Sequence, residues 1–383
     1  MKHNQYGDKI SFFKEPERFD KYSEKDFLSY CLGGTLYMPA LKNFADIIIN
    51  RKISGLTSIV VCFEDAIDEK DVPAAEVNAL SQLDVLKKAS DDGIVSDDDI
   101  PLIFFRARNT EQFKSFTKRI KVESLDYFTG FVFPKFSSDD AEEYLKELDR
   151  LNKQYPETIM YGMPILESKT IAFKETRFEE LLKIKSYLDE YKKYILNVRV
   201  GATDFSSAFA VRRGIDYSIY DIMTVRDCLL DILNVFSRNN DYTVSGPVWE
   251  YFLVSKDNKF DSTLDFSLQS SLLKRKRLID EAIDGLLREV LLDIANGFVG
   301  KTAIHPTHIK YINAMLAVTE EEYNDAVQIL ETSGGVVKSE KSNKMNEINP
   351  HRSWARKIFN RARAYGVIKD ETEFLKVIAE TEK

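Results

Sequence analysis

The sequence alternates short apolar runs with helical stretches over residues 35–306, and this alternation constrains the fold more than any other feature. Eight runs have the length and the β-branched or aromatic content of buried strands. They cover residues 35–39, 58–65, 101–107, 128–134, 159–167, 194–205, 242–252 and 301–306. Such strands, separated by helices, are typical of a parallel sheet covered on both sides. Eight of them predict an α/β protein with a closed (β/α)8 TIM barrel.

An open doubly wound sheet is the alternative fold for the same alternation. That fold commonly carries a G-x-G-x-x-G motif after its first strand, and no such motif follows residues 35–39. We therefore expect the barrel at residues 31–332, with an N-terminal helical extension over residues 1–30 and a C-terminal helical extension over residues 333–383.

The tail after the last predicted strand has three parts with different patterns. A capping box, Thr319 to Glu322, begins a helix that is expected to run to about Thr332. Residues 333–344 are rich in Gly, Ser and Lys and predict a mobile linker, and residues 349–367 have the spacing of an amphipathic helix. A helix after a mobile linker can cover an active site, either its own or that of a neighbouring subunit.

Composition excludes several classes of protein. Apolar residues make up 44% of the 383 residues, enough for a sizeable core, and the net charge of −8 argues against nucleic acid or an anionic membrane as the partner. No apolar stretch predicts a signal peptide or a membrane span. Three cysteines (Cys31, Cys62 and Cys228) form no C-x-x-C pair, so we expect a reducing, cytoplasmic location. The basic run 274–277 predicts a solvated helix face, with an anion-binding patch as the alternative.

Polar residues gather where the predicted strands end. In a parallel barrel the catalytic groups lie at the carboxyl ends of the strands, where the loops converge. The residues at those positions are Glu64, Asp65, Arg106, Arg108, Lys135, Glu167, Asp204, Glu250 and His305. Any one of them can belong to an ion pair of the barrel rim, and a histidine at the end of a strand is often structural. Their joint presence predicts an active site at this end.

Glu167 and Asp204 follow two adjacent strands and can hold one divalent cation. Two carboxylates suit Mg²⁺, or Mn²⁺ in its place, because such a cation keeps open positions for water or for a chelating 2-oxo acid. The cation would act as a Lewis acid on the enolate oxygen that forms when a C–C bond breaks. Arg106 could pair with the substrate carboxylate and add positive potential near the enolate.

Other catalytic motifs fit less well. The segment ANGFVGKT, residues 295–302, nearly spells a phosphate-binding loop, but Ala295 replaces the first glycine and the order is helix then strand. There is no G-x-S-x-G elbow, and the four histidines are not spaced as a zinc pair.

Seven segments, in their order and spacing, resemble the HpcH/HpaI aldolase and citrate lyase β-subunit superfamily. They are LYMPA, FEDAID, FFRAR, FPK, ILES, RVGATDF and GFVGKTAIHPTHI, and they cover roughly residues 33–330. The tail MNEINPHRSWARKIFNRARAYGV is similar to that of the divergent C–C bond lyase group associated with bacterial tellurium-resistance and stress genes. The resemblance implies a (β/α)8 barrel, Mg²⁺ ligation by Glu167 and Asp204, substrate binding by Arg106, and a supporting acidic role for Glu64 or Asp65.

The sequence departs from that superfamily at three places. Cys62 stands where an acidic residue is usual, PKFSS lacks the acid that commonly follows proline and lysine, and Arg108 stands where asparagine is frequent. The two metal-binding carboxylates are intact. These departures bear on the substrate and on its acyl carrier.

The first functional hypothesis is a metal-dependent lyase or aldolase that acts on a 2-oxo acid or an acyl-thioester such as a coenzyme A thioester. Arg106, Glu64 and Asp65 would be catalytic, and Arg106, Arg108, Lys135 and His305 would bind substrate. A malate synthase-like condensing enzyme is the second reading. The third is a barrel that binds a metabolite or a partner within a stress system and has little catalysis of its own. In each case we expect a homo-oligomer in which the tail after Gly334 packs over a neighbour's site.

Overall fold

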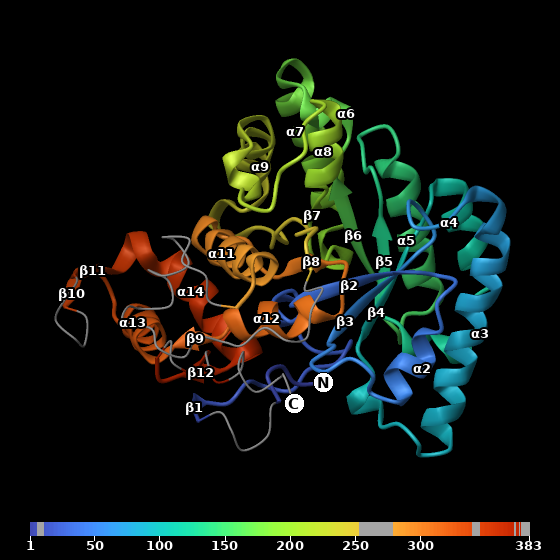
Figure 1. Cartoon of the computed structure of the whole chain (residues 1–383), viewed down its shortest axis with the longest axis horizontal. Helices are drawn as coiled ribbons and strands as arrows, with labels where there is room; N and C mark the ends of the chain where they lie inside the picture. The colour runs from blue at the N-terminus through green and yellow to red at the C-terminus, as the bar shows by residue number, and fades with distance from the viewer. Residues whose placement is uncertain (6–10, 253–278, 339–344, 371–372, 375, 377–383) are drawn as a thin grey trace.

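The computed structural model describes residues 1–5, 11–252, 279–338, 345–370, 373–374 and 376. A parallel sheet in the order β7-β6-β5-β4-β3-β2-β8 forms the centre of this part of the chain (Figure 1). Its strands are β2 Gly34–Pro39, β3 Ser58–Cys62, β4 Leu102–Arg106, β5 Gly130–Phe133, β6 Tyr161–Leu166, β7 Arg199–Val200 and β8 Lys301–Ala303. Each lies within a predicted run or extends it by one residue.

Residues 243–246 close the ring between β7 and β8. Val198 pairs with Val244, and Gly246 pairs with Lys301, both in the parallel sense. The Ser245 amide donates to the Val198 carbonyl at 2.9 Å, and the Val299 amide donates to the Val244 carbonyl at 2.7 Å. The segment thus takes the place of the eighth strand that was predicted over residues 242–252, and the barrel is confirmed.

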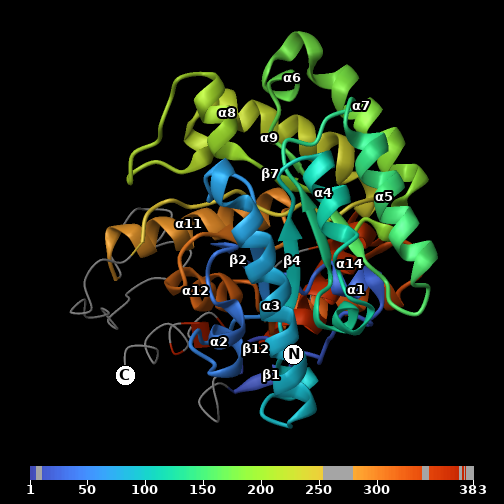
Figure 2. The same ribbon diagram turned by 90° about the vertical axis from the view of Figure 1, so that its right-hand side faces the viewer.

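Helices surround the sheet on its outer side (Figure 2). They are α2 Phe44–Ile49, α3 Val72–Asp91, α4 Thr110–Thr117, α5 Ala141–Gln154, α6 Lys169–Ala172, α7 Lys174–Glu190, α9 Met223–Phe236, α11 Glu281–Asn296 and α12 Thr307–Met315. No helix in the described ranges has the length and apolarity needed to cross a membrane. The basic run 274–277 lies outside the described residues, as does the start of the helix predicted around it.

Buried aromatic residues give the strands their rigidity next to the site. Every residue of β4 is buried, from Leu102 to Arg106. The ring of Phe105 packs against the rings of Phe116 and Phe128 at centroid distances of 5.2 and 5.3 Å. Burying each such side chain stabilises the fold by about 1.5–3 kcal/mol, and this packing holds Arg106 at the carboxyl end of its strand.

The run expected as a strand over residues 194–205 has a different structure at its end. β7 stops at Val200, and the helix α8, Ala202–Ala208, begins directly after Gly201. Asp204 therefore lies in the first turn of a helix and not at the end of the strand that was predicted over residues 194–205. An acidic residue is favourable there because it faces the unpaired amides of the helix start.

The N-terminal segment is mostly not helical, which corrects the prediction of a helical extension. Among the described residues up to 30, only α1, Lys25–Leu28, is helical, whereas β1, Phe12–Lys14, is a strand. Strand β1 pairs antiparallel with β12, Val367–Ile368, and β12 pairs with β9, Val318–Thr319. The two ends of the chain thus share one small sheet.

The tail after the barrel packs as a helical pair on this sheet. The predicted capping box is confirmed: Thr319 and Glu322 exchange hydrogen bonds at the start of α13, Glu320–Glu331. Helix α14, Ile348–Tyr365, packs against α13 around a small apolar cluster that includes Ile329 and Ile358. Part of the predicted linker is ordered, since β10, Val336–Lys338, pairs with β11, Met345–Glu347. Residues 339–344 lie outside the described residues.

Helix α14 lies at the amino end of the barrel, opposite the predicted site. Its Tyr365 hydroxyl donates to the Tyr30 carbonyl at 2.6 Å, and its Lys357 ammonium donates to the Gly297 carbonyl at 3.1 Å. Both carbonyls belong to segments that precede strands. In Figures 1 and 2 the small sheet of β1 and β12 lies at the lower end, and α8 lies near the upper end. In its own chain the helix is therefore remote from the carboxyl ends of the strands.

Candidate active site

Arg106, the last residue of β4, joins the carboxylates that follow β3 and β6. Its Nη2 lies 2.7 Å from Glu64, 3.1 Å from Glu167 and 3.4 Å from Asp65. Arg106, Glu64 and Glu167 are all buried. The buried guanidinium compensates the charge of two buried acids, so three strand ends are fixed relative to one another.

Lys135 completes this cluster from the end of β5. Its backbone amide donates to Oε1 of Glu167 at 2.9 Å, and its ammonium pairs with Glu64 and, at 3.2 Å, with Asp65. The backbone of Lys135 has a φ of +46°, a conformation that a residue other than glycine rarely adopts. Such strain is characteristic of functional sites, and here it turns an amide toward Glu167.

The second carboxylate oxygen of Glu167 is turned toward the segment that carries Asp204. Arg106 and the Lys135 amide both contact Oε1, whereas Oε2 faces Gly201. The pKa of Glu167 is raised to about 7, mainly by burial; Arg106 opposes this rise, and the neighbouring Asp204 adds to it. Two neighbouring carboxylates repel each other, and the charge of a bound cation relieves that repulsion, so Glu167 and Asp204 are a suitable pair for a cation.

The donor set fits a cation with few protein ligands. Among the residues that the structure describes, no group of three or more His, Cys, Asp and Glu side chains could hold a metal ion. A cation at Glu167 and Asp204 would take its remaining ligands from water or from a substrate, which is the usual arrangement of Mg²⁺ in enzymes.

A cavity of about 190 Å³ connects these carboxylates to the interior of the barrel. Asp65, Arg106, Glu167 and Asp204 line it. The structure thus brings together Arg106, Lys135, Glu64, Asp65 and Glu167 by direct contact, and it places Asp204 on the same cavity. Cys62 belongs to this cluster as well, because its sulfur lies 3.9 Å from Nη1 of Arg106.

Three of the residues named from the strand ends neither line this cavity nor join the cluster around Arg106. Arg108 donates to the carbonyls of Phe63 and Ile67 at 3.4 and 3.2 Å. Glu250 pairs with Arg213. His305 accepts or donates a hydrogen bond to the Thr307 hydroxyl at 2.7 Å and stacks on a phenylalanine ring.

Sequence reasoning missed Arg199, Tyr37 and Thr302, which also line the cavity. Nη2 of Arg199 donates to the Thr302 hydroxyl at 2.8 Å, and the guanidinium lies over the Tyr37 ring at 5.4 Å. A signal was present, since a charged arginine in the largely apolar run ILNVRV is unusual for a buried strand.

The segment GFVGKT nearly spells a phosphate-binding loop, but its lysine pairs with carboxylates of the protein itself. Lys301 is buried, and its ammonium lies 2.9 Å from Glu289 and 2.7 Å from Asp293, both on α11. Glu289 also pairs with Arg213. Because the ammonium is enclosed by protein carboxylates, the structure agrees with the rejection of a phosphate-binding loop.

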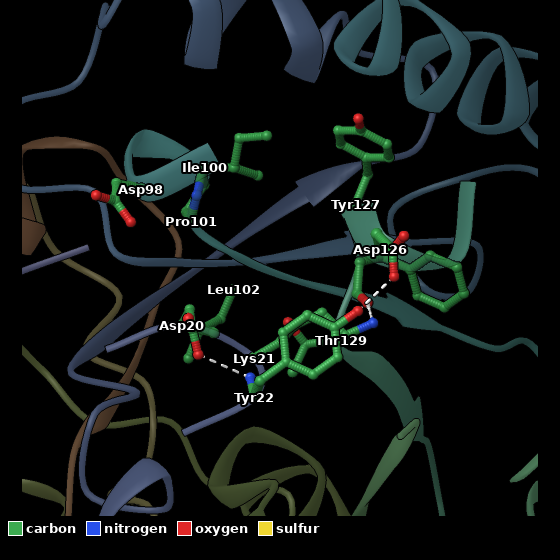
Figure 3. A pocket seen from close by; sticks show the side chains of 11 residues that line it. Asp20, Lys21, Tyr22, Asp98, Ile100, Pro101, Leu102, Asp126, Tyr127 and Thr129 are labelled. Atoms are coloured by element: carbon green, nitrogen blue, oxygen red, sulfur yellow. Dashed lines mark hydrogen bonds between the residues drawn. The ribbon is translucent and has the colours of Figure 1, made fainter. Parts of the chain in front are cut away.

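A larger cavity, of about 370 Å³, lies at the amino ends of β4 and β5 (Figure 3). Lys21 lies in its wall and donates to the carbonyls of Leu125 and Phe128, and burial lowers the pKa of this lysine to about 7. Tyr22 donates to Asp126 beside it. None of the residues predicted at the strand ends lines this cavity.

One comparison with a solved structure agrees with the barrel. The chain is similar to CitE from Mycobacterium tuberculosis in complex with magnesium, acetoacetate and coenzyme A, with a TM-score of 0.51 and 17% identity over 86% of this chain and 97% of that chain. It is also similar to RipC from Yersinia pestis, with a TM-score of 0.45 and 17% identity over 75% and 95%. A comparison with curated protein sequences finds no match.

A sequence family decides the classification. The family described as C–C bond lyase of the TIM-barrel fold matches residues 26–367, which include the barrel, α13 and α14. The chain therefore belongs to the C–C bond lyase family of the TIM-barrel fold.

Proposed function

We propose that the protein is a divalent-cation-dependent lyase or aldolase that breaks or forms a C–C bond next to a 2-oxo or acyl-thioester carbon. One observation carries the proposal. Glu167 and Asp204 follow adjacent strands and face one cavity, and Glu167 is fixed there by Arg106 and the Lys135 amide.

Glu167 and Asp204 would hold the cation, Mg²⁺ or Mn²⁺. Such a cation supplies Lewis-acid polarisation of a carbonyl oxygen when it is bound. Oε2 of Glu167, which faces Gly201, is the oxygen placed for ligation, because Oε1 already accepts two hydrogen bonds.

Arg106, Glu64 and Asp65 would act around the reacting carbon. The guanidinium of Arg106 lies on the cavity wall and adds positive potential where negative charge develops. Asp65 also lines the cavity, and 57% of its side chain is exposed, so a substrate can reach it. Lys135, half exposed at the rim, would meet an anionic part of the substrate. Arg108 and His305 would act only on a part of the substrate that extends beyond the cavity.

Calorimetric titration with Mg²⁺ tests the metal site directly. Asp204→Asn and Glu167→Gln should each weaken Mg²⁺ binding at least tenfold while the circular dichroism spectrum stays native. Asp139→Asn, an exposed acid that follows β5, is the matched control and should bind Mg²⁺ like the wild type. Unchanged affinity in both site variants would refute the proposal.

The reaction class needs a substrate panel. Release of a 2-oxo acid or of a free acyl-thioester from hydroxyacyl-thioesters and 4-hydroxy-2-oxo acids, dependent on Mg²⁺, would identify a lyase. Release of free thiol from acetyl-coenzyme A and glyoxylate would identify a malate synthase-like enzyme instead. The CitE structure named above holds magnesium, acetoacetate and coenzyme A, so coenzyme A thioesters are the first to test.

A barrel that binds a metabolite without turnover is the second candidate function. The contact of Cys62 with Arg106 favours it, because a thiol stands where related sequences usually carry an acid. Clear thermal stabilisation by a 2-oxo acid or thioester, with no product from any of them, would support this candidate.

A further inference from the structure

Arg199 is a buried cation whose charge is not balanced by a carboxylate. Only 1% of the residue is exposed. Its guanidinium donates to two neutral hydroxyls, that of Thr302 at 2.8 Å and that of Thr35 at 3.4 Å. Its Nε is buried and has no hydrogen-bond partner. Within the described residues, no acidic side chain forms an ion pair with it.

The other buried arginines each have carboxylate partners, which Arg199 lacks. Arg106 pairs with Glu64 and Glu167. Arg177 pairs with two aspartates of α9, and Arg213 pairs with Glu250 and Glu289. A buried charge without a counterion is costly, so such charges are paired or bind a ligand. Arg199 lines the cavity. A ligand in the cavity could therefore supply the missing counterion as an anionic group.

The register of the strands places Arg199 deeper than the two proposed metal ligands. Arg199 pairs with Ile165 and Val200 pairs with Leu166, so Glu167 and Gly201 follow at the next level. Two residues along a strand correspond to roughly 7 Å. The backbones of Arg199 and Glu167 are offset by that distance, and both side chains line one cavity with Asp204, so a ligand of five or six carbons with one end at Glu167 and Asp204 can reach Arg199 with its other end.

The surroundings of Arg199 hold its guanidinium in one orientation. Thr35 and Thr302 come from the neighbouring strands β2 and β8, and the Tyr37 ring lies 5.4 Å from the guanidinium carbon. Neutral hydroxyls position the group without cancelling its charge. Arg106, in contrast, already has carboxylate partners, and an anion near it must compete with them.

We propose that Arg199 is an anion subsite, which binds a carboxylate at the end of the substrate remote from Glu167 and Asp204. The cavity then selects 2-oxo dicarboxylates over 2-oxo monocarboxylates of the same length. The 2-oxo end of this assignment rests on the proposed function, whereas the anion subsite rests on Arg199 alone.

Matched pairs of ligands test the subsite. In the presence of Mg²⁺, calorimetry compares 2-oxoglutarate with 2-oxopentanoate, and 2-oxoadipate with 2-oxohexanoate. The wild type should bind at least one dicarboxylate tenfold or more tightly than its monocarboxylate partner. Arg199→Met should remove that preference and leave monocarboxylate binding within about threefold. Arg226→Met, which alters an exposed arginine of α9 outside the cavity, should keep the preference.

Two further measurements separate this inference from the proposed function. If Mg²⁺ does not bind but glutarate still binds more tightly than pentanoate, and only when Arg199 is present, the subsite holds and the metal chemistry fails. If Arg199→Met does not fold, Arg199→Lys retains a cation and should keep part of the preference. A wild type without preference in either ligand pair, or an Arg199→Met variant that retains the preference, overturns the inference.

Discussion

A Cβ atom on Gly201 would lie 2.0 Å from Oε2 of Glu167. No side chain fits there, so Gly201 sets the position of the carboxylate. Gly201→Ala should displace Glu167, weaken Mg²⁺ binding at least tenfold, and lower the free energy of unfolding by about 1–3 kcal/mol. Calorimetry and urea denaturation measure the two effects.

Gly214→Ala is the control for this substitution. A Cβ at Gly214 would meet only the Tyr217 ring, at 3.7 Å, which is an ordinary contact. Its Mg²⁺ affinity should equal that of the wild type. Equal effects of the two alanines would show that Gly201 does not position Glu167.

Removal of Arg106 should destabilise the barrel. Arg106→Met leaves Glu64 and Glu167 buried without their guanidinium, and loss of one partner of a buried pair typically costs about 3–5 kcal/mol. Arg108→Met removes an arginine that contacts only backbone carbonyls on its guanidinium side, so its cost should be smaller. Urea denaturation of both variants tests the difference, and equal costs would contradict it.

Two buried histidines should make the protein less stable in mild acid. Burial lowers the pKa of His3 from 6.5 to about 3 and that of His308 to about 4. Between about pH 4 and 6.5 the unfolded chain binds protons that the folded chain does not, so stability falls as the pH decreases. The slope is at most about 1.4 kcal/mol per pH unit for each histidine.

Denaturation curves at pH 5, 6 and 7 check this dependence. His3→Gln should flatten the slope below pH 6.5. Asn4→Ala is the control, because the Asn4 side chain donates to the Tyr365 carbonyl at 2.9 Å beside His3 and does not titrate. It should lower stability equally at each pH. A slope that His3→Gln leaves unchanged would contradict the assignment.

The homo-oligomer expected from the sequence stays a prediction, and the β10–β11 pair offers a surface for it. Val336 and Met345 are 55% and 57% exposed there. Light scattering should give a mass of at least twice 44.1 kDa. Val336→Glu should reduce it, whereas Ile94→Glu, at a 65% exposed position after α3, should not. A monomeric wild type would exclude a tail that covers a neighbour's site.

The parts of the fold that the sequence predicted correctly depend on local pattern. Strand β4 lies within the predicted run 101–107 because its apolar residues are buried on both faces and give an unbroken signal. The capping box at Thr319 is equally local. β1 was missed because its three residues are paired with a strand about 355 positions later, and no pattern within residues 1–30 records that partner.

The candidate site was predictable as a set of strand ends but not as a set of contacts. Glu64, Arg106 and Glu167 meet because the parallel strands β3, β4 and β6 end on the same side of the barrel and the long Arg106 side chain reaches both carboxylates. Glu250 and His305 were also predicted at strand ends on this side of the barrel, yet their side chains contact Arg213 and Thr307. The direction of a side chain after the last strand residue depends on the loop backbone, which strand periodicity does not determine.

Pairing between β1 and β12 also has a consequence for synthesis of the chain. Residues 12–14 are synthesised about 355 residues before their partners at residues 367–368. At about 5–20 residues per second, the interval is roughly 20–70 s. Throughout that time the edge of β1, with its apolar residue Phe12, is unpaired and can associate with other chains. Newly made chains should therefore need chaperones or a low concentration more than the finished barrel does.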